Sequence, residues 1–219
     1  MENRRPSSRA KAVPARGSYR HGDLRRALLE AGLALAAEGG PEAVVLREAT
    51  RRAGVAPNAA YRHFAGRQDL LEAVRRAAVA AMAEGMEAQM AALAQAGDAA
   101  QQARARLRAV GAGYLRFART QTGLFRTAFG GSFTLASSGD PDTAGRSGMD
   151  PFQHLGHALD LLVAAGLLPA ARRPGAEFLA WSTVHGLALL VIDGPLRGLA
   201  PEQVDGLAQR LLDMVERGL

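Results

Sequence analysis

The 219-residue chain contains no cysteine. This absence excludes disulfide bonds, thiolate catalysis and cysteine-ligated zinc, and it fits a reducing compartment, so we expect a cytoplasmic location. Long apolar runs are missing as well. The longest, residues 186–192, is far shorter than the roughly 20 apolar residues that cross a bilayer, and the basic N-terminal segment lacks the apolar stretch of a secretory signal. We therefore expect no membrane partner.

Sequence motifs of common catalytic sites are also lacking. The chain has no HExxH pattern, no glycine-rich phosphate loop and no nucleophile elbow, so we expect neither enzymatic activity nor a cofactor or metal. One enzymatic alternative remains. His154 and His157 are three residues apart in a helical stretch and Asp160 follows three residues later, a spacing that metal ligands can use. A metal-dependent enzyme would use these residues together with His185.

Basic residues are distributed unevenly along the chain. Residues 1–78 hold 15 arginine and lysine residues against 8 acidic ones, whereas residues 79–219 hold 12 against 13. The whole positive surplus therefore lies in the first third. Because each neutralised phosphate releases counterions and adds affinity, this excess indicates a module that binds a polyanion. A protein that coats DNA without sequence preference would show the same excess and is a second alternative.

Apolar residues recur at helical spacing along most of the chain, and no stretch shows the pattern of a strand. The sequence therefore predicts an all-α fold, with helices over residues 23–37, 67–96, 99–120, 123–129, 151–165, 176–193 and 201–217. The helix over 176–193 is apolar nearly all round, so protein should cover both of its faces. Residues 130–149 are rich in glycine, serine and aspartate without periodicity, which predicts a mobile loop.

Two short helices with a glycine turn between them are predicted over residues 45–64. Gly54 stands where the chain must reverse sharply, a conformation that glycine adopts without steric cost. Pro57 suits the first turn of the second helix, predicted to run to Phe64, because its missing N–H would be unpaired there anyway. With the helix over 23–37 as a floor, this pattern is a helix-turn-helix.

These patterns divide the chain into three parts. Residues 1–18 are polar and rich in arginine, proline and serine, which predicts a flexible basic arm. Basic residues of this segment and of the positions just after it, with Arg16 and Arg20 as candidates, could follow a phosphate backbone or enter a minor groove; the alternative is a solvated tail. Residues 19–66 form the predicted DNA-binding domain. Residues 67–219 are predicted to form a larger helical domain.

The residues from 19 to 74 closely resemble the tetracycline-repressor-like (TetR) family of bacterial transcriptional regulators. The resemblance is carried by the string LREATRRAGVAPNAAYRHFAGRQDLLEAV, residues 46–74, which matches in residue type and spacing. Farther along, Trp181, His185 and Gly186 look like a Trp-His-Gly type of C-terminal ligand-binding domain found in one branch of the family. The resemblance implies an all-α dimer with a DNA-reading N-terminal domain and a variable effector domain. Residues 67–219 would then be the domain for ligand binding and dimerisation.

The resemblance also implies where DNA is contacted. Bases are approached at Asn58 and Ala59, and phosphates are touched at Tyr61, His63 and Arg67. The complete candidate set is Val45, Arg47, Ala56, Pro57, Asn58, Ala59, Tyr61, Arg62, His63 and Arg67, with Arg16 and Arg20 before the first helix. Val45 and Ala56 depart from the family, which usually has Ser or Thr there, hydroxyls that cap helices and can reach phosphate.

Physical arguments support the same helix. An α-helix fits the major groove, where Asn58 can pair with adenine and Arg62 can reach guanine or phosphate. Arg62 could instead hold Glu48. Tyr61 could be part of the core, but beside an arginine and a histidine we expect its hydroxyl to be exposed and to contact phosphate.

Aromatic residues of the C-terminal two-thirds could line an apolar cavity with a few polar groups that orient a ligand. The candidates are Tyr114, Phe117, Phe125, Phe129, Phe152, Trp181 and His185. For each of them, ordinary core packing is the alternative. His185 differs because a histidine inside an apolar helix needs a partner, either a buried neighbour or a ligand.

Together these features predict a ligand-responsive, DNA-binding transcriptional regulator. We expect a repressor that binds a near-palindromic double-stranded DNA operator as a homodimer and is released by a small-molecule effector. Half-sites would lie about one helical turn apart. The last two helices would form a four-helix interface between the two copies.

Overall fold

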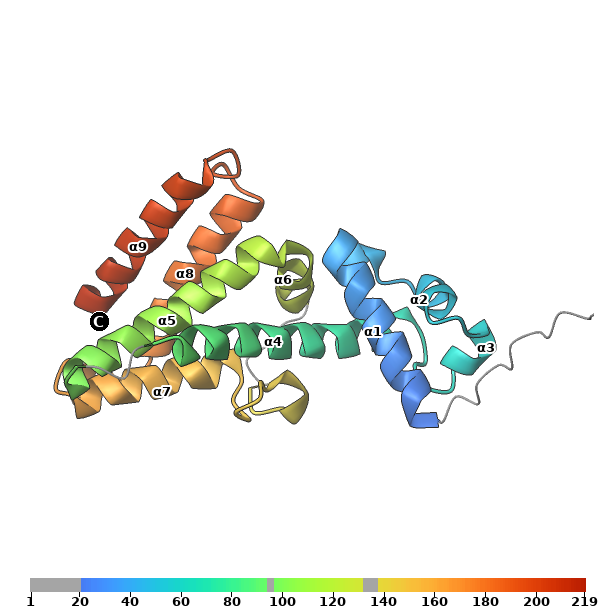
Figure 1. Ribbon diagram of the computed structural model, residues 1–219, viewed down its shortest axis with the longest axis horizontal. Coiled ribbons are helices and arrows are strands. Elements are labelled where there is room, and N and C mark those ends of the chain that lie inside the picture. The colour runs from blue at the N-terminus through green and yellow to red at the C-terminus, as the bar shows by residue number, and fades with distance from the viewer. Residues whose placement is uncertain (1–20, 94–96, 132–137) are drawn as a thin grey trace, which may run out of the picture.

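The computed structural model describes residues 21–93, 97–131 and 138–219, with the side chains of residues 21–23 left out. Within these ranges every regular element is helical, as predicted. Figure 1 shows α4 (Arg67–Ala91) as a central helix that joins a small N-terminal group of helices to a larger C-terminal body. None of the helices in the described ranges is long and apolar enough to cross a membrane. The predicted basic arm lies outside the described residues, and so do both Arg16 and Arg20.

The N-terminal group contains α1 (His21–Gly39), η1 (Pro41–Ala43), α2 (Leu46–Arg52) and α3 (Pro57–Ala60). The predicted apolar stripe of α1 is buried at Leu28, Ala31 and Leu35. Figure 1 shows α1 crossing the N-terminal part of α4. The crossing is close, because a Cβ built on Gly32 would stand 2.6 Å from Cγ2 of Val74.

The turn between α2 and α3 confirms the role predicted for Gly54, which has φ of +68°. The N–H of Gly54 donates to the carbonyl of Arg51 at 3.3 Å, and the N–H of Val55 donates to the carbonyl of Thr50 at 3.0 Å. This pair of bonds is the Schellman closure of a helix end. The direction of the chain after α2 is therefore set by backbone bonds and one left-handed glycine.

The second helix is shorter than the predicted span of 57–64. The α-helix ends at Ala60, and a turn follows over residues 61–63. Here the N–H groups of His63 and Phe64 both donate to the carbonyl of Ala60, each at 2.9 Å. Because two donors share one acceptor, the chain tightens after Ala60 and leaves α-helical geometry, although Phe64 still reaches the core.

The C-terminal body contains α4, α5 (Ala99–Thr120), α6 (Thr122–Phe129), η3 (Pro141–Thr143), α7 (Pro151–Ala164), η4 (Ala170–Arg172), α8 (Ala176–Ile192) and α9 (Pro201–Gly218). Figure 1 shows α8 and α9 as a pair on one side of the body, and α6 beside α1 at the junction with the N-terminal group. The predicted bounds hold for α5. The prediction that α4 extends to residue 96 is wrong, because the N–H of Leu93 bonds to the carbonyl of Met90, and this i−3 bond closes the last turn.

The segment before α7 was expected to be a mobile loop, but its described part, residues 138–149, is fastened to the body. The carboxylate of Glu87 on α4 accepts bonds from the N–H groups of Arg146 and Ser147, both at 3.0 Å, and from the hydroxyl of Ser147 at 2.7 Å. Asp150 accepts bonds from the Ser138 hydroxyl and the N–H of residue 139. Two acids separated by 63 positions therefore hold this segment in place.

Candidate nucleic-acid interface and ligand cavity

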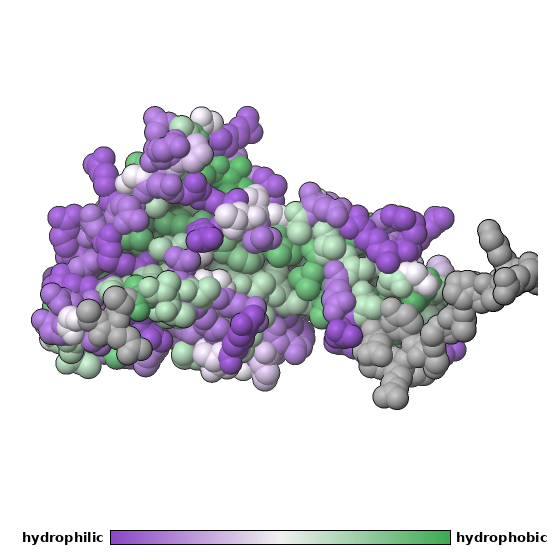
Figure 2. Space-filling model, viewed as in Figure 1, coloured by the Kyte–Doolittle hydropathy of each residue, from purple (hydrophilic) through white to green (hydrophobic). Residues whose placement is uncertain are grey.

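The surface formed by α3 and the turn after it carries exposed side chains over a buried base. Ala60 and Phe64 are buried, whereas Asn58, Tyr61 and Arg62 are exposed, Tyr61 with 60% of its surface. Tyr61 is therefore not a core residue. Figure 2 shows hydrophilic side chains over α2 at the same end of the molecule. The arrangement presents a row of polar side chains on a rigid apolar support.

The other predicted contact residues surround this row. Val45, Arg47, Ala56 and Pro57 are exposed, and Ala59 and His63 are partly exposed. Val45 and Ala56 are the N-cap residues of α2 and α3, and neither start is capped by a side-chain hydrogen bond. The two helix starts thus lack the capping hydroxyl that the resemblance implies at these positions.

Two arginines of α2 are already engaged by protein carboxylates. Arg51 and Arg52 both bond to Glu48, and Arg52 also holds Glu38 through two bonds of 2.7 and 2.6 Å. The hydrogen bond from Arg51 lowers the pKa of Glu48 to about 2, so this carboxylate stays ionised and competes with phosphate for both arginines. The charge excess of the first third therefore overstates the number of arginines available to a polyanion.

Arg62 does not hold Glu48, which was the alternative for this residue. In the described ranges no ion pair engages Arg62 or Arg47, and both are exposed. Arg67 differs from them. Its Nε donates to the carbonyl of Val44 and its Nη2 to that of Pro41, both at 2.9 Å. These bonds tie the start of α4 to the segment before α2, so Arg67 has a positioning role, and its phosphate contact stays a prediction.

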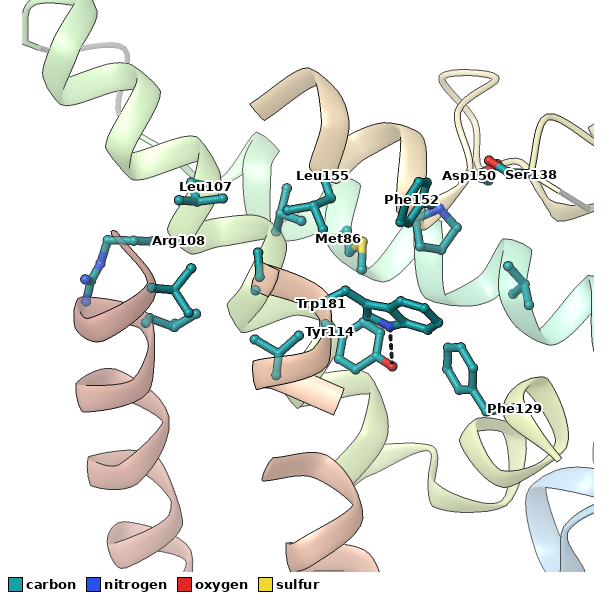
Figure 3. Close-up of a pocket in the computed structure, with 18 of the residues that line it drawn as sticks. Met86, Leu107, Arg108, Tyr114, Phe129, Ser138, Asp150, Phe152, Leu155 and Trp181 are labelled. Atoms are coloured by element: carbon teal, nitrogen blue, oxygen red, sulfur yellow. Dashed lines mark hydrogen bonds between the residues drawn. The ribbon is translucent and has the colours of Figure 1, made fainter. Parts of the chain in front are cut away.

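An apolar cavity lies among α4, α5, α7, α8 and α9 (Figure 3). Four of the predicted residues line it, namely Tyr114, Phe129, Phe152 and Trp181. The sequence reasoning missed its aliphatic wall, which includes Met86, Leu107, Leu155, Val184 and Leu212, because such residues have the spacing of ordinary core positions. It also missed Asp150, whose signal was a capping box at the start of α7.

Phe117, Phe125 and His185 do not line this cavity. Phe117 and Phe125 are buried core residues, and the Phe125 ring packs edge-on against Tyr114 with 5.6 Å between centroids. His185 lies next to Tyr114, with Nδ1 at 2.6 Å from the phenolic oxygen. For the two phenylalanines, core packing is therefore the better interpretation, and His185 has a protein neighbour as its partner.

Tyr114 joins two cavity helices through a chain of hydrogen bonds. Nε1 of Trp181 donates to the Tyr114 oxygen at 3.2 Å, and the hydroxyl of Tyr114 pairs with Nδ1 of His185. Burial lowers the pKa of His185 and raises the pKa of Tyr114, so at neutral pH the imidazole is uncharged and the phenol keeps its proton. We assign the phenolic proton to the bond with Nδ1, because a neutral imidazole offers one nitrogen as an acceptor.

The residues of the metal-enzyme alternative do not converge. His154 is buried, with Nε2 at 3.3 Å from Oε1 of Glu87, whereas His157 is exposed on the same helix. Asp160 accepts a bond of 2.7 Å from Arg173. Among the described residues no group of three or more His, Asp or Glu could hold a metal ion. The alternative has no support in this geometry.

Replacing His154 with glutamine should weaken the loss of stability at low pH. Burial lowers the pKa of His154, although the carboxylate of Glu87 opposes this shift. The unfolded chain therefore takes up the proton first as the pH falls below about 6.5, and the folded state loses stability from there downward. We expect the melting temperature to fall less between pH 7 and pH 5.5 in His154→Gln than in the wild type. His157→Gln on the exposed face should keep the wild-type slope, and equal slopes in all three proteins would contradict the prediction.

Two family models match the chain. Residues 28–74 match the model described as bacterial regulatory proteins, tetR family, which covers α2 and α3. Residues 107–215 match the tetracyclin repressor-like C-terminal domain, which covers most of the cavity. No curated protein matches the chain in sequence.

Solved structures show the same fold. A protein of unknown function from Rhodococcus sp. RHA1 is 26% identical and superposes with a TM-score of 0.64 over 93% of this chain and 99% of its own. The TetR family transcriptional regulator PfmR from Thermus thermophilus is 20% identical, with a TM-score of 0.53 over 88% and 98%. A TetR variant from Acinetobacter baumannii AYE, in complex with minocycline, is 19% identical, with a TM-score of 0.56 over 92% and 96%.

Proposed function

We propose that this protein acts as a repressor and that a small molecule releases it from its operator. The chain belongs to the tetR family of bacterial regulatory proteins and is a ligand-responsive, DNA-binding transcriptional regulator. Regulators of this family bind DNA and effectors, generally as dimers, and are generally not enzymes. One observation supports the proposal that this protein reads DNA with α3: the side chains of Asn58, Tyr61 and Arg62 are exposed, whereas Ala60 and Phe64 beneath them are buried.

The exposed side chains of α3 and the turn after it suit contacts in the major groove of DNA. Asn58 stands in the first turn of α3 and offers an amide to adenine, while Arg62 offers a guanidinium to guanine or phosphate. The exposed hydroxyl of Tyr61 would be available to a phosphate of the DNA backbone. Because Gly54 and the bonds around it fix the entry of the chain into α3, these side chains start from a rigid position.

A second copy of the chain would cover the outer face of α8 and α9. Exposed apolar side chains gather there, namely Phe178, Leu179, Leu189 and Leu190 on α8 and Met214 on α9. A dimer built on this face would carry two reading helices, and a near-palindromic operator would present half-sites roughly 34–36 Å apart. Sedimentation velocity at working concentration should show a dimer, and a monomer alone would argue against this arrangement.

Helix α6 offers a route from the cavity to the reading helices. Phe129, its last residue, lines the cavity. Arg75 of α4 donates from Nε to the carbonyl of Thr127 at 3.2 Å and from Nη2 to that of Gly130 at 2.8 Å. A ligand that displaces Phe129 would therefore move the end of α6 together with α4, and the separation of the two reading helices would change.

Replacing Arg62 with alanine tests the function directly. Selection from a pool of random duplex DNA should first yield a near-palindromic site. On that site we expect Arg62→Ala to lose about 1–3 kcal/mol of binding free energy, measured by fluorescence anisotropy. Arg146→Ala serves as the control, because this arginine is in the effector domain and 84% of its side chain is exposed. Unchanged affinity in Arg62→Ala would remove it from the interface, and a pool with no enriched sequence would overturn the proposed operator.

A further inference from the structure

We infer that the cavity takes an uncharged, ring-bearing effector whose polar group, where it has one, is a hydrogen-bond donor. This inference rests on the proposed function, because it names the ligand class of the same cavity. It follows from three properties of the described wall: its aromatic end, the engagement of its charged residues and the use of its polar hydrogens.

One part of the cavity is aromatic. The rings of Phe152 and Trp181 meet nearly at right angles with 6.3 Å between centroids, and Phe129 lies 6.1 Å from Trp181 (Figure 3). Farther along, the wall is aliphatic, with Leu107 and Leu155 among its residues. A ligand with an apolar surface would bind here favourably, because binding removes that surface and the cavity wall from water. The rings of the wall favour edge or offset contacts with a ring of the ligand.

The two charged residues of the described wall are engaged within the protein. Arg108 donates to Asp213, Glu216 and Gln209 on α9, and Figure 3 shows its guanidinium turned away from the aromatic side chains. Asp150 is buried and accepts bonds from Ser138 and from the N–H groups of residues 139 and 153. A charged ligand group would thus be buried without a counter-charge unless it broke one of these sets, which is costly.

The side-chain hydrogens that the described residues of the wall can donate are likewise used within the protein. Four side chains donate them: Ser138 to Asp150, Thr143 to the carbonyl of Asp140, Trp181 to Tyr114, and Tyr114 to His185. The Tyr114 oxygen has two lone pairs and accepts one bond, so it can accept a second from a ligand O–H or N–H. Among the described residues of the wall, the side-chain donors that further ligand acceptors would need are already engaged within the protein.

Two dyes with the same ring skeleton separate these possibilities. N-phenyl-1-naphthylamine is neutral and carries one N–H donor, and 1-anilinonaphthalene-8-sulfonate adds a sulfonate. Because Trp181 is the single tryptophan of the chain and lines the cavity, energy transfer from it to the dye reports binding near the site. We expect the neutral dye to bind at least about tenfold more tightly than the sulfonate. Equal or tighter binding of the sulfonate would overturn the inference.

A pair of variants places the dye inside the cavity. Ala180→Phe fills a lining position and should abolish energy transfer to the neutral dye. Ala88→Phe, at an exposed position of α4 that does not line the cavity, should leave it unchanged. If circular dichroism shows that Ala180→Phe does not fold, a displacement assay on the wild type takes the place of this variant. Diphenylamine should then displace the neutral dye, and diphenylamine-4-sulfonate should not. Retained transfer in folded Ala180→Phe, or displacement by both compounds alike, would overturn the inference.

The operator assay keeps this inference separate from the proposed function. Binding of the neutral dye in the cavity without any release of the operator would support the ligand class and count against effector-driven release. Release by the sulfonate alone would support the proposed function and overturn the ligand class.

Discussion

An alanine at Gly123 is expected to lower the free energy of unfolding by about 1–3 kcal/mol or more. A Cβ at this position would stand 2.2 Å from the carbonyl oxygen of Ala36 and 2.5 Å from that of Ala37. Both are backbone atoms in the last turns of α1, so no flexible side chain can move aside. The start of α6 and the end of α1 would have to separate, and we expect operator affinity to fall as well because α1 supports α2 and α3.

Urea denaturation measures this effect, with Gly85→Ala as the matched control. Gly85 also lies in a helix, but a Cβ there would meet only the ring of Phe117 at an ordinary 3.9 Å. Alanine should therefore stabilise α4 at this position by up to about 1 kcal/mol through its helix propensity. If Gly123→Ala proves as stable as Gly85→Ala, the close approach of α1 and α6 is refuted.

Replacing Arg75 with methionine should have the second large effect, a loss of about 2–4 kcal/mol of unfolding free energy. Arg75 is buried, and its guanidinium bonds to Glu72 and to the carbonyls of Thr127 and Gly130. Methionine fills a similar volume but leaves those two carbonyls without this donor. Because the same bonds tie α6 to α4, the variant should also respond less to an effector in the operator assay.

The neighbouring arginine provides the control for Arg75→Met. Arg76 follows it on α4, but 40% of its side chain is exposed and its carboxylate partners Glu72, Asp140 and Asp142 lie at 3.5–3.7 Å. Exposed pairs of this kind contribute little, so Arg76→Met should change stability by less than about 1 kcal/mol. Equal losses in the two variants would show that burial and the bonds to α6 are not what makes Arg75 important.

The helices could be predicted from the sequence because each has its own local pattern. The period of α5 and the apolar character of α8 depend on residues a few positions apart, and both helices agree with the structure. The predicted cover over both faces of α8 stays a prediction, because Phe178, Leu179, Leu189 and Leu190 are exposed in the single chain. The length of the reading helix could not be predicted in this way. It depends on how two N–H groups compete for the carbonyl of Ala60, and helical spacing continues through Phe64 all the same.

The cavity was only partly predictable, for a geometric reason. Phe125 and Phe129 are four residues apart on the same face of α6, and yet only the second lines the cavity. The spacing of apolar residues identifies the inward face of a helix, but it does not show whether that face meets packed side chains or a cavity. The contact between Glu87 and Ser147 spans 60 positions, so the local sequence gives no sign of it. The polar composition of the segment around Ser147 therefore predicted a mobile loop.

Arginine partners were hidden from the sequence for a related reason. Arg52 bonds to Glu38, 14 positions earlier, and Arg67 bonds to carbonyls more than 20 positions earlier. A charge count treats all these arginines as equivalent. The three-dimensional arrangement separates those that hold the protein together from Arg47 and Arg62, which stand exposed on the candidate interface.

The backbone closure at Gly54 has a consequence for how the protein can evolve. Neither the start of α2 nor the start of α3 depends on a side-chain cap. The turn between them is held by backbone bonds, and the buried residues Ala60 and Phe64 lie beneath the surface of α3 and the turn after it. The residues that hold this turn are therefore different from the residues that we propose to read the DNA sequence. Exposed positions such as Asn58 and Arg62 can be exchanged at a cost usually within about 0.5 kcal/mol of stability. A library randomised at those positions alone should consist largely of folded proteins with new operator preferences.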